Sequence, residues 1–493
     1  MKSVPGLQPL LALALLAAPG AAGAEGSAWE HSIVTLEVAR KQYDYYQPWS
    51  KGLRRLQKAG LVVGEREVLT TADELFERTL VRLQKGGRGQ WWMGQAAWID
   101  YHANLALVTT AEADFWRDLK PATLGSAAPS QGAMQILRWR EGNLENRRAE
   151  FTQFSVREGQ LSPLNHVVLE VSSDIQGVGW GEPVVVNAQV AGLLTAQEGR
   201  NCYALPASSI RAILQARRQG AYPGLGYFHF YWQPAKNTAS LAWLGLTGEP
   251  RGVMVVHVPD RPDGRDQVLK PKDILLNIDG FDLDIQGDYN DPEFGHLNLE
   301  ALATRGKWAG QDLKMQLWRE GKPMAVSYCL PKFEYTNALV PYAVHDQEPE
   351  YLLLGGLVFQ PLTDSYLQSW GAEWKRNAPF RLYYYNSEEP TKERPALVLL
   401  SHVLPDAYNI GYQDQKYLVL HKVNGQPVSR LPELRDALQK PLNGYHILEF
   451  VHSDSLRRMV LAAGQAEREA TARVLEHYGI DQAFRFATPA AGK

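Results

Sequence analysis

The first part of the chain, up to about residue 205, is dominated by short runs in which apolar and polar residues alternate. Such alternation is typical of strands that bury one face. Gly, Pro and Asn residues break the runs, and this spacing indicates a β-barrel or a β-sandwich. The predicted strands cover residues 32–38, 67–71, 80–83, 105–108, 134–139, 167–171, 184–186 and 190–195.

A helix is predicted over residues 207–218, because Ile210, Ile213 and Leu214 fall on one face at helical spacing. Gly220 and Pro223 then mark a boundary. A second helix, with a polar outer face, is predicted over residues 463–477. We expect it to pack on the unit that precedes it.

Two later stretches repeat one arrangement about 140 residues apart. Each starts at a glycine among large apolar residues and continues through strands to an Asp-Gly or Asn-Gly turn, at 279–280 and 424–425, which is a strong hairpin signal. A helical pattern follows at 297–304 and 431–438, and a strand follows at 313–318 and 446–451. The order of these parts resembles PDZ domains of the Deg/HtrA type, although a generic α+β unit remains an alternative.

In a PDZ module, backbone N–H groups of a glycine loop hold a terminal carboxylate while the peptide adds to a strand edge. For the first module, the candidate residues are Leu225, Gly226 and Tyr227. For the second module, they are Gly355, Gly356 and Leu357. Pro361 follows in the strand that would pair with the ligand and removes one donor, so peptide binding by the second module is in doubt.

The N-terminus has the pattern of a signal peptide. Lys2 precedes an apolar run over residues 10–18, which is too short to span a membrane, and Ala22-Gly23-Ala24 has the small residues of a cleavage site. We predict a signal peptide over residues 1–24 and an exported protein, periplasmic or secreted. An uncleaved membrane anchor is the alternative. Cys202 and Cys329 could form a bridge in an oxidising compartment, but two free thiols are favoured because the cysteines fall in different predicted domains.

Composition excludes several classes of protein. The 493 residues carry a net charge of −3, and 45% hydrophobic and 21% charged residues are ordinary for a globular protein, not a disordered or collagenous one. The near-neutral charge gives no support for a nucleic-acid partner, because phosphate binding needs a clustered basic face. The 12 histidines show no metal-ligand spacing, so neither a metal nor a cofactor is predicted. No apolar run after residue 30 is long enough to span a bilayer.

Several segments, in collinear order from about residue 32 to 482, resemble the branch of the Deg/HtrA serine proteases that carries two PDZ-like domains. Val68-Leu69-Thr70-Thr71-Ala72-Asp73 resembles the family's V-L-T-N-A-H, and 103–107 resembles C-D-L-A-L. Residues 178–183 resemble G-N-S-G-G-P. The segments 222–226, 355–363 and 409–412 resemble PDZ signatures. The resemblance implies a mostly β protein: a trypsin-like double β-barrel, two PDZ-like α+β domains and a C-terminal helix.

Each position of the family's catalytic triad carries another residue. The position of the histidine base is Asp73, that of the orienting aspartate is Asn104, and that of the nucleophilic serine is Trp180. Glu182 replaces the second glycine after the nucleophile. Trp180 has no hydroxyl group, and without a nucleophile and an imidazole the acyl-enzyme route is lost. The resemblance therefore predicts an inactive homologue of serine endopeptidases.

A displaced catalytic site is the competing interpretation. Ser172, Ser173, His102 and His166 are the candidate residues, but none lies in a nucleophile-like turn such as G-x-S-x-G. Surface or hydrogen-bonded roles are the simpler interpretation.

The expected domains are a signal peptide (1–24), a protease-like domain (25–219), PDZ-like domains at 220–333 and 334–465, and a C-terminal helix and tail (466–493). We predict a silent protease that binds peptide segments or C-termini as a chaperone-like or regulatory scaffold in protein quality control, with an active homologous protease as a possible partner. An active endopeptidase with a rearranged site and a purely structural subunit are alternatives. An aromatic group lies near the N-terminus and comprises Tyr43, Tyr45, Tyr46 and Trp49. The resemblance implies a trimer, and this group could form contacts between its subunits. The alternative is that these side chains belong to the core or to a strand edge.

Overall fold

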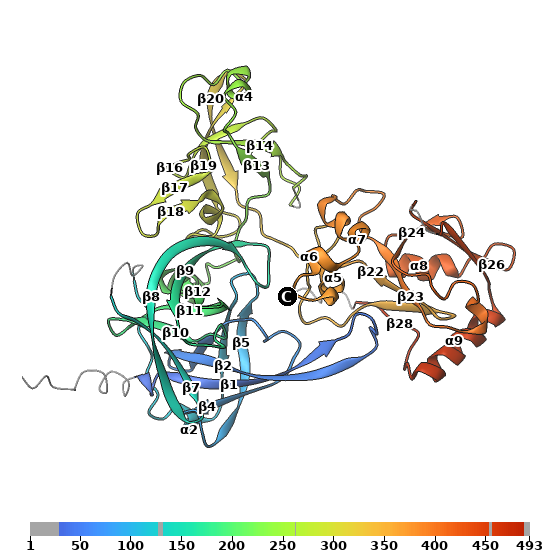
Figure 1. Cartoon of the computed structure of the whole chain (residues 1–493), viewed down its shortest axis with the longest axis horizontal. Helices are drawn as coiled ribbons and strands as arrows, with labels where there is room; N and C mark the ends of the chain where they lie inside the picture. Colours follow the sequence, from blue (N-terminus) through green and yellow to red (C-terminus); the bar gives the residue numbers. More distant parts are fainter. Residues whose placement is uncertain (1–28, 127–131, 262, 453–455, 488–493) are drawn as a thin grey trace, which may run out of the picture.

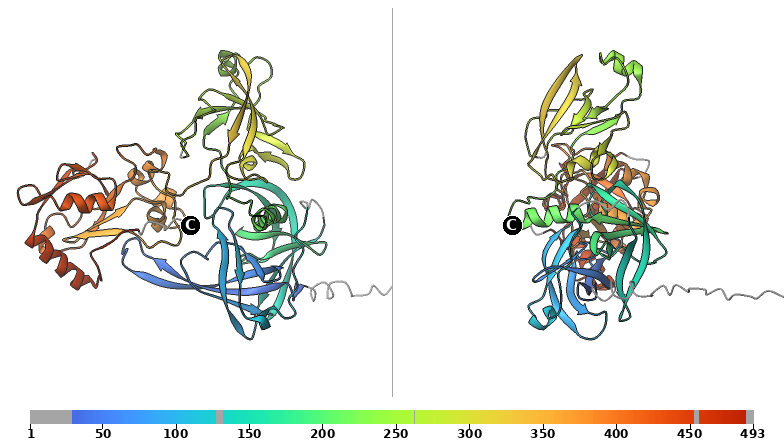
Figure 2. Two further views of the ribbon diagram at one scale, coloured as in Figure 1. Left: turned by 180° about the vertical axis from the view of Figure 1, so that it is seen from behind. Right: turned by 90° about the vertical axis from the view of Figure 1, so that its left-hand side faces the viewer.

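The computed structural model describes residues 29–126, 132–261, 263–452 and 456–487. Figure 1 shows two adjoining β-barrels, a smaller unit above them and a C-terminal unit to one side, and the views in Figure 2 show the same three lobes. Strands make up most of the regular structure, as predicted. The predicted signal peptide lies outside the described residues.

The first barrel closes in the strand order β1-β2-β3-β6-β5-β4. Its core is built from apolar side chains of alternate strand positions, such as Val34, Leu36 and Val38 of β1. The β1–β2 hairpin is long, and it reaches toward the C-terminal unit (Figure 1). The elements are β1 (Ile33–Tyr43), β2 (Lys51–Gly64), β3 (Glu67–Thr70), β4 (Arg78–Lys85), β5 (Trp91–Asp100), β6 (Leu105–Thr109) and α2 (Ala113–Trp116).

The second barrel closes in the order β10-β11-β12-β9-β8-β7 and is followed by helix α3. The predicted face of α3, which includes Ile210, Ile213 and Leu214, is buried against this barrel. Two closed barrels in sequence match the predicted double-barrel fold. The elements are β7 (Met134–Arg140), β8 (Asn143–Glu158), β9 (Asn165–Ser173), β10 (Pro183–Val186), β11 (Gln189–Glu198), β12 (Asn201–Pro206) and α3 (Ala207–Arg218).

The next unit, which we call the first module, is a sheet in the order β13-β14-β15-β19-β20, and β16 pairs with β15 through the predicted Asp279-Gly280 turn. The helix predicted at 297–304 is instead the short 3₁₀ helix η1, which leaves little helical surface. The elements are β13 (Tyr231–Pro234), α4 (Thr238–Trp243), β14 (Val253–His257), β15 (Ile274–Ile278), β16 (Phe281–Asp282), β17 (Asp288–Asp291), β18 (Gly295–Asn298), η1 (Leu299–Ala303), β19 (Asp312–Arg319) and β20 (Lys322–Cys329).

The C-terminal unit, which we call the second module, is a sheet in the order β27-β26-β24-β23-β22-β21-β28. The predicted helix at 431–438 is α8, and the predicted C-terminal helix is α9, which contacts β21 and β27 of this module. Its strands are β21 (Tyr351–Leu354), β22 (Leu357–Pro361), β23 (Val398–Val403), β24 (Leu418–Val423), β25 (Gln426–Pro427), β26 (Tyr445–Phe450), β27 (Arg458–Ala462) and β28 (Phe484–Arg485). Its helices are α5 (Asp364–Leu367), η2 (Gln368–Trp370), α6 (Trp374–Asn377), α7 (Phe380–Tyr384), η3 (Tyr385–Ser387), η4 (Ala407–Asn409), α8 (Leu431–Leu438) and α9 (Gln465–Tyr478).

The aromatic group near the N-terminus packs within the chain. Tyr45 joins the apolar cluster of the second module, and the Tyr46 ring lies 5.7 Å from that of Trp370. The Trp49 ring lies 5.9 Å from that of Tyr351. These contacts favour the core interpretation of the group and leave the predicted trimer untested.

Both cysteines are free thiols, as predicted; Cys202 is buried, and Cys329 is half-buried. Within the described residues, no helix is long and apolar enough to cross a membrane.

Candidate functional site

Two of the three residues predicted at the triad positions meet where β3 and β6 lie side by side. Asp73 follows β3, and Asn104 immediately precedes β6. The Asn104 Oδ1 atom accepts a hydrogen bond from the Asp73 backbone N–H at 2.9 Å. Asn104 adopts a left-handed φ of 49°, which Asn tolerates better than most residues. The barrel thus brings these two residues into direct contact.

Trp180 reaches the same region from the second barrel. It lies in the loop between β9 and β10, and its carbonyl oxygen accepts the N–H of Ala59 on β2 at 3.0 Å. Lys58, the neighbour of Ala59, directs its ammonium group toward the Trp180 ring, at 6.0 Å from the ring centre. The same ammonium group donates a hydrogen bond to the Asp73 carbonyl oxygen. Lys58 therefore connects Asp73 with Trp180.

Lys58 was not predicted as a site residue, because nothing in the sequence distinguishes it from other lysines in polar strands. Its side chain is buried and donates a hydrogen bond to Thr71 Oγ1 at 2.7 Å. Burial lowers the pKa of Lys58 to about 8, although the charges of Asp73 and Glu182 oppose the shift. Burial likewise raises the pKa of Asp73 above its usual range.

A hydroxyl group beside an amine of lowered pKa can be an activated nucleophile, and the Lys58–Thr71 pair has these two groups. Thr71 has no exposed surface. Its oxygen accepts the lysine hydrogen bond within the barrel and cannot meet a substrate carbonyl without a rearrangement of β2 and β3.

Glu182 holds backbone amides in the loop that carries Trp180. Its Oε2 atom accepts the N–H groups of Gly179 at 2.9 Å and Trp180 at 2.8 Å. The carboxyl group is buried, and burial raises its pKa, an effect that the two amide hydrogen bonds oppose. The carboxylate side chain thus folds back under the loop.

The oxyanion hole of trypsin-like proteases consists of the N–H of the nucleophile and the N–H of the residue two positions before it. The matching amides here belong to Trp180 and Val178. Glu182 accepts the first, and Gln197 Oε1 accepts the second at 3.2 Å. Both amides therefore have acceptors from the chain itself. Gln197, on β11, carries no sequence signal that would have identified this role.

A shallow pocket of about 340 Å³ adjoins these residues. Trp180, Lys58 and Glu182 form one side of it, and Arg138 forms another. Arg138 is held by Glu145 at 2.7 Å and by the carbonyl oxygens of residues 176 and 177. The guanidinium group of Arg138 is therefore already bound within the chain, and Arg140 is the other arginine of the lining.

The candidates for a displaced site have partners of their own. Ser173 donates a hydrogen bond to the Arg148 carbonyl oxygen at 2.7 Å, and the His102 ring stacks on Tyr335 at 4.4 Å. Burial lowers the pKa of both His102 and His166 to about 4. In the described part of the chain, no hydrogen bond links these histidines or the serine pair 172–173 to Asp73, Asn104 or Trp180.

The predicted carboxylate loop of the first module is partly buried. Leu225 packs into the apolar cluster that includes α3, and a Cβ added to Gly226 would lie 2.7 Å from Leu330. The Tyr227 hydroxyl group contacts His229 Nδ1 at 2.9 Å. Only Tyr227 of the three therefore reaches a polar environment.

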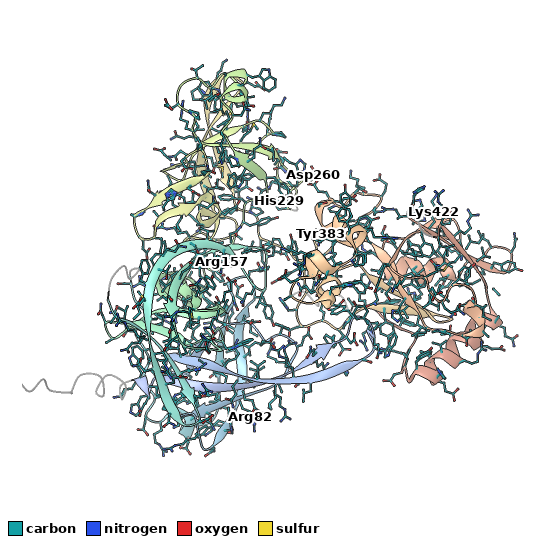
Figure 3. All side chains as sticks on the ribbon, in the orientation of Figure 1. Arg82, Arg157, His229, Asp260, Tyr383 and Lys422 are labelled. Atoms are coloured by element: carbon teal, nitrogen blue, oxygen red, sulfur yellow. The ribbon has the colours of Figure 1, made fainter. Side chains whose placement is uncertain are left out.

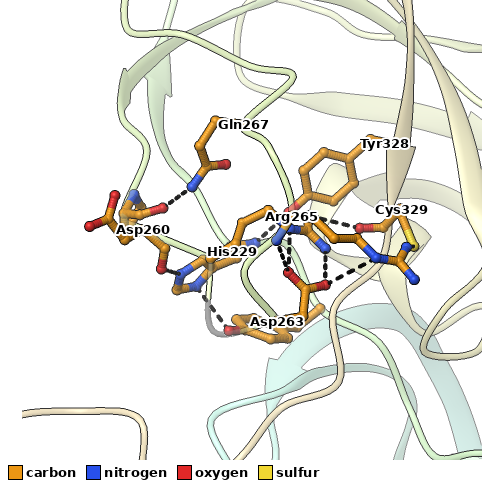
Figure 4. A network of polar contacts seen from close by, with 10 residues as sticks. His229, Asp260, Asp263, Arg265, Gln267, Tyr328 and Cys329 are labelled. Atoms are coloured by element: carbon orange, nitrogen blue, oxygen red, sulfur yellow. Dashed lines mark hydrogen bonds and ion pairs between the residues drawn. The ribbon is translucent and has the colours of Figure 1, made fainter.

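That environment is a dense polar network (Figure 4). His229 Nε2 contacts the carbonyl oxygen of Asp260, and the His229 backbone N–H donates to the Tyr328 hydroxyl group at 2.9 Å. Asp263 binds the guanidinium group of Arg261 at 2.6 Å, and this holds the pKa of Asp263 at about 2. The segment from Tyr227 to His229 is therefore held by groups of the β14–β15 connection and of β20.

The strand that follows this loop, β13, is at the edge of its sheet. It pairs with β14 on one side, and within the described residues no strand pairs with its other side. Trp232 of this strand donates a hydrogen bond to Glu300 of η1 at 2.7 Å, while Tyr231 is exposed. Pro234 ends the strand, as is common at a sheet edge.

The second module differs from the prediction. Gly355 and Gly356 form the tight turn between β21 and β22, and the Gly355 N–H donates to Thr471 Oγ1 at 2.9 Å. Leu357 pairs with Leu354 on one side and with β23 on the other. These residues therefore form a closed hairpin and not an open carboxylate loop, because β21 occupies the edge that a peptide would need.

Three side chains of the first module could together hold a metal ion. The ligand atoms of Asp284, Asp288 and His296 lie within 4.8 Å of one another among the described residues. They are largely exposed and already hydrogen-bonded, His296 to Asp288 at 3.1 Å. Nothing else at this hairpin indicates a ligand.

Comparison with known proteins finds similarity to PDZ domains and to Do-like proteases. A PDZ-domain family model matches residues 340–484. The chain is 21% identical over 458 residues to putative protease Do-like 13 of Arabidopsis thaliana, across 91% of this chain and 87% of the relative. It is 23% identical over 479 residues to the chloroplastic protease Do-like 2 of the same plant, across 91% and 74%. Among solved structures, the HtrA-type protease AlgW with a decapeptide has a TM-score of 0.47 at 15% identity and covers 63% of this chain and 98% of its own.

Proposed function

This chain is a divergent relative of the Deg/HtrA serine proteases, and from that premise we propose that it does not cut peptides but binds them. Its barrels keep the architecture of a protease, while Asp73, Asn104 and Trp180 take the places of the triad. The chain then acts as a chaperone-like or regulatory scaffold in protein quality control, which an active homologous protease could join. We further propose that it is exported and assembles with copies of itself.

The observation that carries the proposal is that the backbone N–H groups of Val178 and Trp180 already have acceptors within the chain. Hydrolysis through an acyl-enzyme needs free N–H groups where the oxyanion develops. Here Glu182 accepts the N–H of Trp180 at 2.8 Å. A carboxylate at this position also opposes a second negative charge, because like charges repel strongly in a buried site.

The edge strand β13 supports peptide binding by the first module. An extended peptide can pair with the open side of β13 as an added strand. The exposed Tyr231 side chain offers an aromatic contact beside it. The polar network around Tyr227 and His229 immediately precedes this strand and holds its start in place.

The proposal is tested by incubating the full chain with unfolded casein while both cleavage and complex formation are measured. We expect intact casein by mass spectrometry and a complex that is detectable by analytical ultracentrifugation. A fluorescent peptide with uncharged side chains and a free C-terminus then probes β13, and the same peptide with N-methylated amides is the matched control. N-methylation removes the donors of strand pairing without changing the side chains, so it should abolish binding. Cleaved casein, or equal binding of both peptides, contradicts the proposal.

A further inference from the structure

A large cavity separates the first barrel from the second module. It has a volume of about 1140 Å³ and is lined by the tip of the β1–β2 hairpin, by the segment 338–345 that joins the two modules, and by the region from α5 to η3. Tyr383, which lies on the side of the second module that faces the barrels, belongs to this lining (Figure 3). The lining contains none of Asp73, Asn104 and Trp180 and no residue of β13.

The charges that line the cavity are predominantly negative. Four carboxylates belong to the lining: Asp44, Glu77, Glu158 and Asp364. Across the described residues, none of these four lies within 4.0 Å of a basic group in an ion pair, whereas Arg40 of the lining is neutralised by Glu74 outside it. Lys375 is then the one lysine or arginine of the lining without an ion-pair partner among the described residues. The cavity therefore holds an excess of negative charge.

Burial acts on two of these carboxylates. It raises the pKa of Asp364 to about 6, and it raises the pKa of Glu77 above its usual range. Glu77 accepts hydrogen bonds from the Tyr43 hydroxyl group at 3.1 Å and from the Gln347 N–H at 3.0 Å. These neutral donors do not balance its charge. A cation in the cavity would therefore be attracted by both groups.

Aromatic side chains complete the lining, and two of them already bind cations of the chain itself. The Arg40 guanidinium group lies 4.4 Å from the centre of the Phe76 ring, and Lys375 Nζ lies 5.7 Å from that of Trp374. Aromatic faces attract ammonium and guanidinium groups through their quadrupoles. Further rings that line the cavity are those of Tyr43, Tyr45, Tyr46, Tyr342 and Tyr383.

We propose that this cavity binds an extended polypeptide segment that carries lysine or arginine side chains. Carboxylates and aromatic faces together select the cationic side chains. The volume exceeds the range of about 300–1,000 Å³ in which small molecules usually bind, and thus suits a chain of several residues. The site lies apart from β13, so the proposal goes beyond the peptide binding proposed above.

The test measures fluorescence anisotropy of the full chain with an acetylated and amidated octapeptide in which lysine alternates with serine. The blocked ends prevent carboxylate capture by the first module. We expect saturable binding that weakens as salt rises, because salt screens the charges. The double variant Asp364→Asn with Glu77→Gln should weaken binding about tenfold or more. Glu249→Gln, an exposed acid of the first module outside the cavity, is the matched control and should bind like the unchanged chain.

Three results would overturn the proposal: equal binding of a peptide in which glutamate replaces lysine, unchanged affinity of the double variant, or binding of spermine as tight as that of the peptide. The last result would identify a free polyamine as the ligand. Thermal unfolding monitored by circular dichroism shows whether the double variant remains folded. If the uncharged peptide still binds while the lysine peptide does not, only the cavity proposal fails.

Discussion

Reconstruction of the catalytic groups should fail unless Glu182 is also removed. The first chain carries Asp73→His, Asn104→Asp and Trp180→Ser, and the second carries Glu182→Gly in addition. Both include Lys58→Met, because the second chain loses the Asp73 and Glu182 carboxylates that stabilise the buried ammonium group, and the two chains must match at this position. The two chains then differ only at the residue that holds the amides.

The magnitude follows from the geometry. In the first chain, the N–H at position 180 remains bonded to Glu182, as it is at 2.8 Å in the natural chain. Loss of one oxyanion donor costs about 2.7–4 kcal/mol, or about 10²–10³ in kcat. The charge of the carboxylate adds to this cost. We therefore expect the second chain to hydrolyse a peptide amide at least about 100-fold faster than the first.

The assay is cleavage of a fluorogenic peptide at pH 8, with unfolding curves to establish that both chains are folded. A version of the second chain with Trp180→Ala in place of Trp180→Ser reports the rate without a nucleophile. Equal rates of the first and second chains would refute the role assigned to Glu182.

Three further predictions concern charge, backbone and thiols. Burial lowers the pKa of Lys58 from 10.5 to about 8, so between these pH values the unfolded chain binds more protons and stability should rise with pH. Relative to the Lys58→Met variant, we expect the free energy of unfolding in urea to increase by about 1 kcal/mol between pH 7 and 9. A difference that does not change with pH would contradict burial of the ammonium group. Gly356→Ala would place a Cβ 2.2 Å from a backbone oxygen at a φ of 96° and should lower stability by about 1–3 kcal/mol more than Gly425→Ala, which has open space; equal losses in thermal unfolding would refute this. Cys329 should react with a thiol reagent in the folded chain while Cys202, which is buried and has its pKa raised to about 11, reacts only after unfolding; equal rates in a colorimetric assay would contradict this.

The sequence predicted eight strands of the two barrels, and all eight are present. It missed β2, β5, β8 and β12. The first three of these are long, and much of their surface is exposed, as in β8, where few side chains are buried. Polar residues on both faces erase the alternation on which the prediction depends. These strands are fixed by pairing with their neighbours in each closed barrel, which the local sequence pattern does not reveal.

The candidate site was predictable only in part. The motifs predicted Asp73, Trp180 and Glu182 as site residues, and Lys58 contacts both Asp73 and Trp180 in the structure; their equivalence to catalytic positions stays a prediction. Lys58 and Gln197 act through contacts between distant strands. Such contacts depend on strand register, which a single sequence does not reveal.

The glycine signature of the second module misled the prediction for a physical reason. A Gly-Gly pair serves equally well in an open loop and in a tight hairpin turn, because both need positive φ. The apolar run before it, at Leu352 and Leu354, forms β21 and closes the edge. Tertiary packing decides whether the apolar residues before the glycine pair form a strand such as β21 that pairs with β22.

The most direct test of the central claim is exposure of the purified full chain to a fluorophosphonate probe, followed by measurement of its intact mass. An active Deg/HtrA protease treated in parallel gives the positive result. The account predicts that the mass of this chain does not change. A stoichiometric adduct on a serine or threonine of the cleft, lost on substitution of that residue together with any peptidase activity, would contradict it.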